Sequence, residues 1–180
     1  MYPSRERDKR LVLLMAALTL LAAPAGCGGG GGSGSGTTTN AASGQTVSGP
    51  GFSFRAPEGW TAKTLATSAE ARQGPTTVVS VMVLPLLKPY RLALFPRVAK
   101  ELDRVAATYA ANLKGSVALR RTVEVAGRKA RQYEITHGDV VDRITFLLRG
   151  KRNFQLTCRW ESGGGGPAAC DQLTSTFAFR

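Results

Sequence analysis

The chain has 180 residues, with 24 Lys and Arg against 12 Asp and Glu and a formal net charge of +12. That length holds one domain with a proper hydrophobic core, and the sequence has no internal repeat of the kind that builds a solenoid. The excess of basic side chains favours an acidic partner, such as anionic lipid headgroups, phosphate-bearing wall polymers or an acidic protein.

Residues 1–26 are typical of a bacterial lipoprotein signal peptide. A charged start is followed by the apolar run Leu11–Ala23, which is shorter than the roughly 20 residues of a membrane-spanning helix. Ala25-Gly26-Cys27 resembles a lipobox, although Pro24 stands where that pattern usually has an aliphatic residue. We therefore predict that Cys27 carries lipid and anchors the protein at the outer face of the cytoplasmic membrane. Cleavage at Ala23-Pro24-Ala25 would instead release a secreted, soluble protein.

The next residues, 27–48, are rich in Gly, Ser and Thr and predict a flexible tether. Such a stretch buries too little apolar surface to offset the entropy lost on ordering. Residues 49–180 are then expected to form one globular domain, exported from the cell, where nucleic acid is not an expected partner.

The first half of the domain predicts a short strand, a central strand and one long helix. Gly51–Phe54 alternates like a strand and is followed by a Pro-x-Gly-Trp turn. Thr77–Leu84 is β-branched and nearly all apolar, which predicts a central strand covered on both faces and ended by Pro85 and Pro89. The helix is expected between Pro96 and Gly115, with an inward stripe of Val98, Leu102, Val105, Tyr109 and Leu113. Its charged residues, Asp103 among them, are expected to face water.

The second half reads as strands in series and a closing helix. Alternating residues from Val117 to Val125 are followed by the hairpin turn Ala126-Gly127 and a strand over 131–136. Two further strands are expected over 140–148 and 153–160, and a short helix from Pro167 to about Ser175. This order predicts an α+β domain in which helices flank a central antiparallel β-sheet.

Three segments carry a resemblance to a known family. They are GFSFRAPEGW at 51–60, VEVAGRKARQYE at 123–134 and VVDRITFLLRGKRNFQLTCRW at 140–160, the last followed by a short helix and Ser-Thr-Phe. The domain resembles the PsbP-like domains, especially those of small actinobacterial lipoproteins. The resemblance implies an α/β/α sandwich and a non-enzymatic, accessory role.

Cys158 and Cys170 are predicted to form a disulfide, because an exported protein folds in an oxidising location. Their spacing does not fit a CxxC redox pair, and no second pair of cysteines is present for zinc. The bridge would close a short loop that contains four glycines and would stabilise the fold by about 3 kcal/mol.

Two sets of residues are candidates for binding. The possible anion-binding patch consists of basic residues around the predicted hairpins: Arg120, Arg121, Arg128, Lys129, Arg131, Arg149, Lys151 and Arg152. The possible apolar interface consists of large side chains in the segment between two prolines: Leu86, Leu87, Leu92, Leu94 and Phe95.

Catalytic residues are not expected. His137 could be imagined with Asp139 and a serine, but no GxSxG elbow accompanies it. Glu134 and Asp142 are expected to pair with Arg131 and Arg143 rather than to hold a metal. No metal or cofactor is predicted.

The sequence thus predicts a lipid-anchored accessory protein that binds an envelope protein complex or an anionic envelope component. The alternative is a carrier for an apolar ligand such as a lipid. A secreted hydrolase is the less favoured third class.

Overall fold

The computed structural model describes residues 44–180. The predicted signal peptide, Cys27 and most of the predicted tether lie outside the described residues. The elements in chain order are β1 (Thr46–Gly49), β2 (Phe52–Arg55), β3 (Thr61–Thr64), β4 (Ser68–Gln73), β5 (Thr77–Tyr90), the 3₁₀ turn η1 (Leu92–Leu94), α1 (Phe95–Asn112), β6 (Ser116–Val125), β7 (Arg128–His137), β8 (Val140–Glu161), α2 (Gly166–Thr176) and β9 (Ala178–Phe179).

The predicted antiparallel sheet is confirmed. Its order is β3-β4-β5-β8-β7-β6, and each neighbouring pair is antiparallel. A smaller sheet has the order β1-β2-β9. The folded part begins before Gly49, because Thr46–Gly49 pairs with β2 and buries Val47 opposite Phe54. Val47 stands alone among small polar residues, so the sequence pattern there is too weak to indicate a strand.

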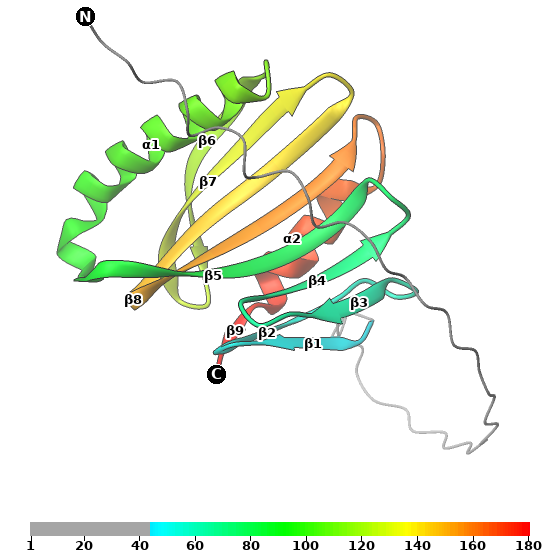
Figure 1. Cartoon of the computed structure of the whole chain (residues 1–180), viewed down its shortest axis with the longest axis horizontal. Coiled ribbons are helices and arrows are strands. Elements are labelled where there is room, and N and C mark those ends of the chain that lie inside the picture. Colours follow the sequence, from blue (N-terminus) through cyan, green and yellow to red (C-terminus); the bar gives the residue numbers. More distant parts are fainter. Residues whose placement is uncertain (1–43) are drawn as a thin grey trace, which may run out of the picture. The chain divides into compact units, whose positions relative to one another are not determined.

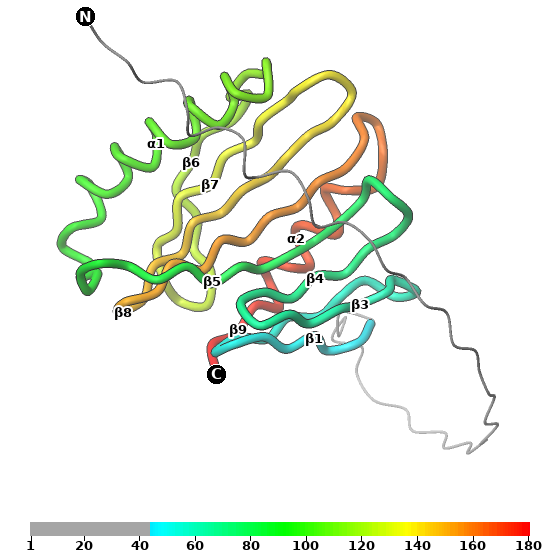
Figure 2. The backbone as a smooth tube through the Cα atoms, viewed as in Figure 1, coloured from blue at the N-terminus to red at the C-terminus, as the bar shows by residue number. Residues whose placement is uncertain are grey.

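Strand β8 folds back on itself. Gly150 has a positive φ of 56°, and the amide of Ser162 donates to the carbonyl of Asp139 at 2.7 Å, so the two ends of β8 meet. The first arm pairs with β7 and the second arm pairs with β5. Figure 2 shows this reversal at the lower left. The two predicted strands, 140–148 and 153–160, correspond to these arms.

The large sheet has a different cover on each face. Helix α1 packs against β6 and β7 on one face, while α2 and the small sheet pack on the other (Figure 1). Alternation within β8 separates the two cores, since Leu147 belongs to the α2 side and Phe146 and Leu148 belong to the α1 side. This arrangement confirms the predicted α+β sandwich.

Helix α1 is turned relative to the predicted stripe. Its buried residues are Ala106 and Ala110, whereas Val105 is 52% exposed. Small side chains let the helix backbone approach the large side chains of Tyr133 and Ile135, which fill that core from β7. The expectation that Val105 is buried is therefore wrong, because periodicity weights large apolar residues and overlooks alanine.

Strand β5 does not end at Pro85. It continues to Tyr90, and its pairing with β8 shifts between Pro85 and Tyr90, so that residues 86–89 form an irregular bulge. A bulge tolerates proline because the missing N–H is not needed in the ladder. Figure 2 shows the chain leaving this end of β5 and turning directly into α1.

The predicted burial of β5 on both faces is also wrong. Val79 and Val81 are buried beneath the α2 side, but Met82 and Leu84 are exposed on the other face. Helix α1 packs mainly on β6 and β7 and leaves Met82 and Leu84 of β5 exposed.

Candidate functional site

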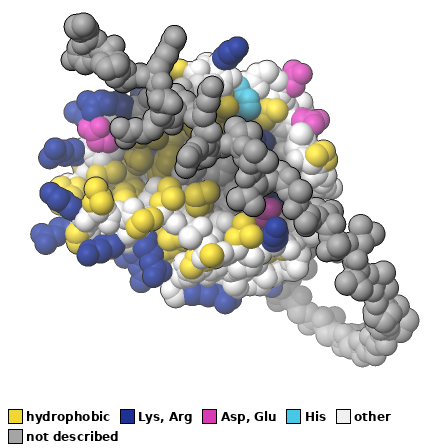
Figure 3. Space-filling view, in the orientation of Figure 1, with side chains coloured by type: hydrophobic (Ala, Val, Ile, Leu, Met, Phe, Trp, Pro, Cys, Tyr) yellow, Lys and Arg dark blue, Asp and Glu magenta, His cyan; other side chains and the backbone are white. Residues whose placement is uncertain are grey.

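An apolar groove lies between α1 and the bulged end of β5. Its walls include six apolar residues, Leu86, Leu87, Leu94, Val98, Leu102 and Val105. Its volume is about 490 Å³, within the range of about 300–1,000 Å³ that is usual for small-molecule sites. Figure 3 shows apolar side chains gathered over this face of the molecule, with Lys and Arg side chains along its left and lower rim.

Two polar atoms in the wall of this groove have no partner among the described residues. They are the Tyr90 hydroxyl and the Asn153 side-chain oxygen, and both are buried. A buried polar group without a hydrogen bond costs about 1–3 kcal/mol. Burial raises the pKa of Tyr90, against a smaller opposing effect of Arg128, so the phenol keeps its proton at neutral pH. The groove therefore has one unused donor and one unused acceptor.

A second hollow continues along the same helix. It is lined by residues from Glu101 to Asn112 and has a volume of about 430 Å³. Glu101 and Val105 line both hollows, so the two hollows adjoin along α1. Tyr109, in the wall of the second hollow, donates a hydrogen bond to a buried carboxylate.

That carboxylate is Asp142, which is 0% exposed. Arg159, on the other arm of β8, donates to both of its oxygens at 2.7 and 2.8 Å. His137 Nε2 lies 3.0 Å from Asp142 Oδ2, and the Tyr109 hydroxyl donates to the same oxygen at 3.4 Å. Burial alone would raise the pKa of Asp142, but the Arg159 hydrogen bonds and charge outweigh it, so the pKa is lowered.

The carboxylates Glu134 and Asp142 form ion pairs, as expected, but one of the two has different partners from those predicted. Glu134 pairs with Arg143 as expected, but Asp142 pairs with Arg159 and with His137. Arg131 binds Asp103 of α1, which also accepts a hydrogen bond from the Tyr133 hydroxyl at 2.6 Å. Asp103 therefore ties α1 to β7 rather than facing water.

His137 contacts Asp142 and not Asp139. Both oxygens of Asp142 accept hydrogen bonds from the Arg159 guanidinium, and no serine hydrogen-bonds to His137 in residues 44–180. Asp142, Arg159 and His137 thus form a charge cluster that links the first arm of β8 to the second. Within the same residues, no group of three or more His, Cys, Asp and Glu side chains is placed to hold a metal ion.

Two solved structures are similar to this chain. The solution structure of cyanobacterial PsbP (CyanoP) from Synechocystis sp. PCC 6803 matches 82% of this chain and 98% of its own length, with a TM-score of 0.56 and 15% identity. The domain has a PsbP-like fold. A crystal structure from Bacteroides thetaiotaomicron matches 76% of this chain with a TM-score of 0.54 and 13% identity, and this chain spans about half of that protein, 48%. No family model and no curated protein matches the chain.

The basic residues of the predicted anion-binding patch do not all lie together in the structure. Arg128 and Arg149 both lie over the Phe179 ring, 5.9 and 4.5 Å from its centre, and Arg152 lies beside Gly51 at the same end of the sheet. Lys129 and Lys151 are exposed near this end.

The other basic residues of the predicted patch lie elsewhere. Arg120 and Arg131 pair with Asp103 of α1, and Arg121 binds Gln132. Adjacent residues of a strand point to opposite faces, which separates Arg120 from Arg121.

The predicted apolar interface is exposed in its central part. Leu87 is 102% exposed, Leu92 is 61% exposed and Leu94 is 43% exposed. Leu86 packs against the α1 core, and Phe95 is half-buried at the start of the helix. Reasoning from the sequence missed Tyr90 and Asn153, whose burial depends on the bulge and on the reversal of β8.

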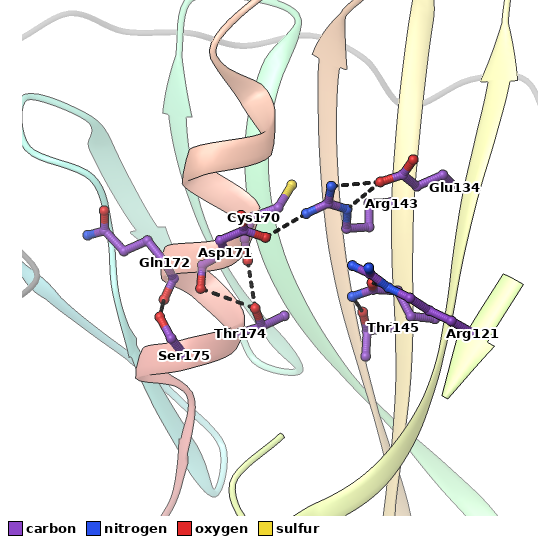
Figure 4. A network of polar contacts seen from close by, with 10 residues as sticks. Arg121, Glu134, Arg143, Thr145, Cys170, Asp171, Gln172, Thr174 and Ser175 are labelled. Carbon is purple, nitrogen blue, oxygen red and sulfur yellow. Dashed lines mark hydrogen bonds and ion pairs between the residues drawn. The ribbon is translucent and has the colours of Figure 1, made fainter. Parts of the chain in front are cut away.

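Cys158 and Cys170 lie together between β8 and α2. Both are buried free thiols, and a hydrogen bond joins them. Burial is the main cause that raises the pKa of Cys158, which makes it a poor nucleophile. Arg143 lies nearby and joins Glu134 to Asp171 of α2, as Figure 4 shows. The disulfide stays a prediction.

No helix in residues 44–180 is long and apolar enough to cross a membrane.

Proposed function

We propose that this protein is an exported, lipid-anchored accessory protein that binds a partner and has no catalytic activity. The observation that carries the proposal is the apolar surface at the end of β5, where Leu87 and Leu94 are exposed in the wall of the groove and Leu92 is exposed in the turn that follows β5. Exposed apolar side chains gathered in one place mark interaction sites. The PsbP-like fold is consistent with an accessory role.

The charged groups support the non-catalytic part of the proposal. Asp103, Glu134 and Asp142 are each engaged by arginine, so none is free to act as a general base. The partner is an envelope protein complex or an anionic envelope component. Arg128, Arg149 and Lys151 would supply positive charge to an anionic partner at one end of the sheet.

The groove favours a second candidate function, that of a carrier for an apolar ligand. Its volume of about 490 Å³ and its leucine and valine lining suit a small hydrophobic molecule. A carrier and an accessory protein could use the same surface, but only the carrier would hold a stoichiometric small molecule.

In-cell photo-cross-linking tests the binding surface. A benzoylphenylalanine at Leu87 should give discrete conjugates, whereas the same residue at the exposed Thr61 of β3 should give none of them. A protein conjugate supports the envelope-complex partner, and conjugates with lipid or wall material support the anionic partner or the carrier. Identical products from both positions, or no product from Leu87, would contradict the proposal.

The anchor is tested separately, by fractionation of cells. Cys27→Ser should move the protein from the membrane fraction to the soluble fraction, because a stable anchor depends on the attached chains. If the unaltered protein is already in the soluble fraction, the protein is secreted and the anchored location is wrong.

A further inference from the structure

The unpartnered atoms of Tyr90 and Asn153 lie in the wall of one groove, although they come from different strands. Tyr90 ends β5 opposite Gly150, and Asn153 pairs with Leu84 on the second arm of β8. Every other polar side chain atom that is buried in residues 44–180 has a hydrogen-bond partner. Most buried polar groups in proteins are paired, so two unpaired groups in one apolar groove require an explanation.

The chemistry of the two atoms defines what would pair with them. The Tyr90 hydroxyl, which keeps its proton, donates to an acceptor, and the Asn153 oxygen accepts from a donor. A hydroxyl group or a carboxamide offers both functions in one group. A hydrocarbon offers neither, and an ester offers an acceptor alone.

The polar and charged groups of the groove disfavour an ionised ligand group. The ionisable side chains in its wall other than Tyr90 are Lys88 and Glu101, which carry opposite charges, and Glu101 is already paired with Arg104. The positive charge of Lys88 disfavours a cationic ligand group, and the Asn153 oxygen, an acceptor, disfavours an anionic group beside it. The remaining wall is leucine, valine and proline, which suits a hydrocarbon chain.

We propose that the groove beside α1 binds a molecule with one hydrocarbon chain and an uncharged hydroxyl or carboxamide group, which accepts from Tyr90 and donates to Asn153. This inference rests on the carrier function proposed above and specifies its ligand. Both atoms are shielded from water in the structure, so the ligand must displace the side chains above them. The bulge at 86–89 is the part of the wall with the fewest backbone restraints, because the pairing of β5 with β8 is interrupted there.

The test uses the full chain carrying Cys27→Ser, with the fluorescent probe N-phenylnaphthylamine bound in the groove. Dodecanol and dodecanamide should displace the probe at about threefold to tenfold lower concentrations than methyl dodecanoate, since one further hydrogen bond is available to them. Asn153→Leu should abolish this preference and leave displacement by the ester unchanged, because the ester accepts from Tyr90 alone. Tyr133→Phe, which alters a tyrosine that is bound to Asp103, should keep the preference.

Each failure has a distinct meaning. Equal displacement by all three compounds overturns the polar assignment while the apolar carrier function stands. No binding of the probe overturns both the assignment and the carrier function. Probe binding that survives Leu94→Asp lies outside the groove and also overturns the proposal, since Leu94 is exposed in its wall.

A second measurement checks the premise in the ligand-free protein. Tyr90→Phe should leave the melting temperature unchanged or higher, because it removes a buried hydroxyl that has no partner. Tyr133→Phe should lower the melting temperature, because it removes a hydrogen bond of 2.6 Å to Asp103. Equal losses in the two variants would mean that the Tyr90 hydroxyl is already satisfied, and the inference would fail.

Discussion

Asp142 illustrates how a single residue depends on the tertiary structure. In the sequence it lies in an apolar strand between Val141 and Arg143, and its pairing with Arg159 is not visible there. The reversal of β8 at Gly150 brings the two arms together and places Arg159 at 2.7 Å from the carboxylate. A buried carboxylate is tolerated because the guanidinium and His137 satisfy it.

Asp142→Asn should lower the free energy of unfolding by about 2–3 kcal/mol at neutral pH. The variant loses the charge-assisted hydrogen bonds from Arg159, whose side chain is 39% exposed and so can be partly rehydrated. Urea denaturation measures the loss, with Glu58→Gln, a change at an exposed turn, as the matched control. A loss no larger than that of the control would show that the pair contributes nothing to stability.

The same pair has a defined dependence on pH. The folded state lowers the pKa of Asp142 below the unfolded value of about 3.9, so its contribution is present above that value. The contribution is lost as the pH falls through the folded pKa. The difference in stability between the unaltered protein and Asp142→Asn should therefore be constant near pH 7 and shrink below about pH 4.

At the scale of elements, α1 decides where the groove lies. Its buried face is built on Ala106 and Ala110, which bring the helix close to β7, and its C-terminal half reaches the Asp142 cluster through Tyr109. The ion pair between Asp103 and Arg131 joins the same face of the helix to β7. Val105 is left facing the groove as a consequence.

Substitution by leucine at two adjacent positions tests this rotation. Ala106→Leu should destabilise the fold by about 1–3 kcal/mol, because the larger side chain does not fit between the helix and the sheet. Val105→Leu should change the stability by less than about 0.5 kcal/mol, because that position is half exposed. Thermal denaturation of the two variants measures the difference. A larger loss of stability in Val105→Leu than in Ala106→Leu would show that Val105, as the sequence predicts, is the buried residue.

The whole domain is stabilised by two separate cores on the two faces of one sheet. The core on the α2 side contains Phe52, Phe154 and Leu173, and it joins the small sheet, α2 and the large sheet. The core on the α1 side is smaller and covers β6, β7 and part of β8. Because α1 is one helix on a wide sheet, it does not cover the whole of β5 on this face, and the groove lies between α1 and the end of β5.

The predicted disulfide belongs to this scale, because it would join α2 to the sheet. Protein isolated from outside the cell should show no free thiol at Cys158 or Cys170 until a reductant is added under denaturing conditions. Reduction should then lower the stability by about 3 kcal/mol, whereas Cys158→Ser with Cys170→Ser should be insensitive to the reductant. Free thiols in the exported protein would contradict the bridge.

Local chemistry made much of the fold predictable from the sequence. The Ala126-Gly127 turn, the alternation of Phe154, Leu156 and Cys158, and the proline that starts α2 each depend on neighbours within a few residues. The antiparallel order of β6, β7 and β8 follows from these short connections. The short strands β3 and β4 were missed, because their alanine, lysine and glutamate residues carry little strand signal.

The elements of the second half, the α+β class and the apolar character of the segment after Pro85 follow from the amino-acid pattern alone. Three features depend on packing in the folded domain: β5 runs past its prolines, Asp142 pairs with Arg159, and Tyr90 and Asn153 lie unpaired in one groove. These two groups of features differ in the distance along the chain over which the responsible interactions act. Turns, caps and alternation act between near neighbours, whereas the groove depends on which strands one helix covers, and that is settled by packing between residues far apart in the chain.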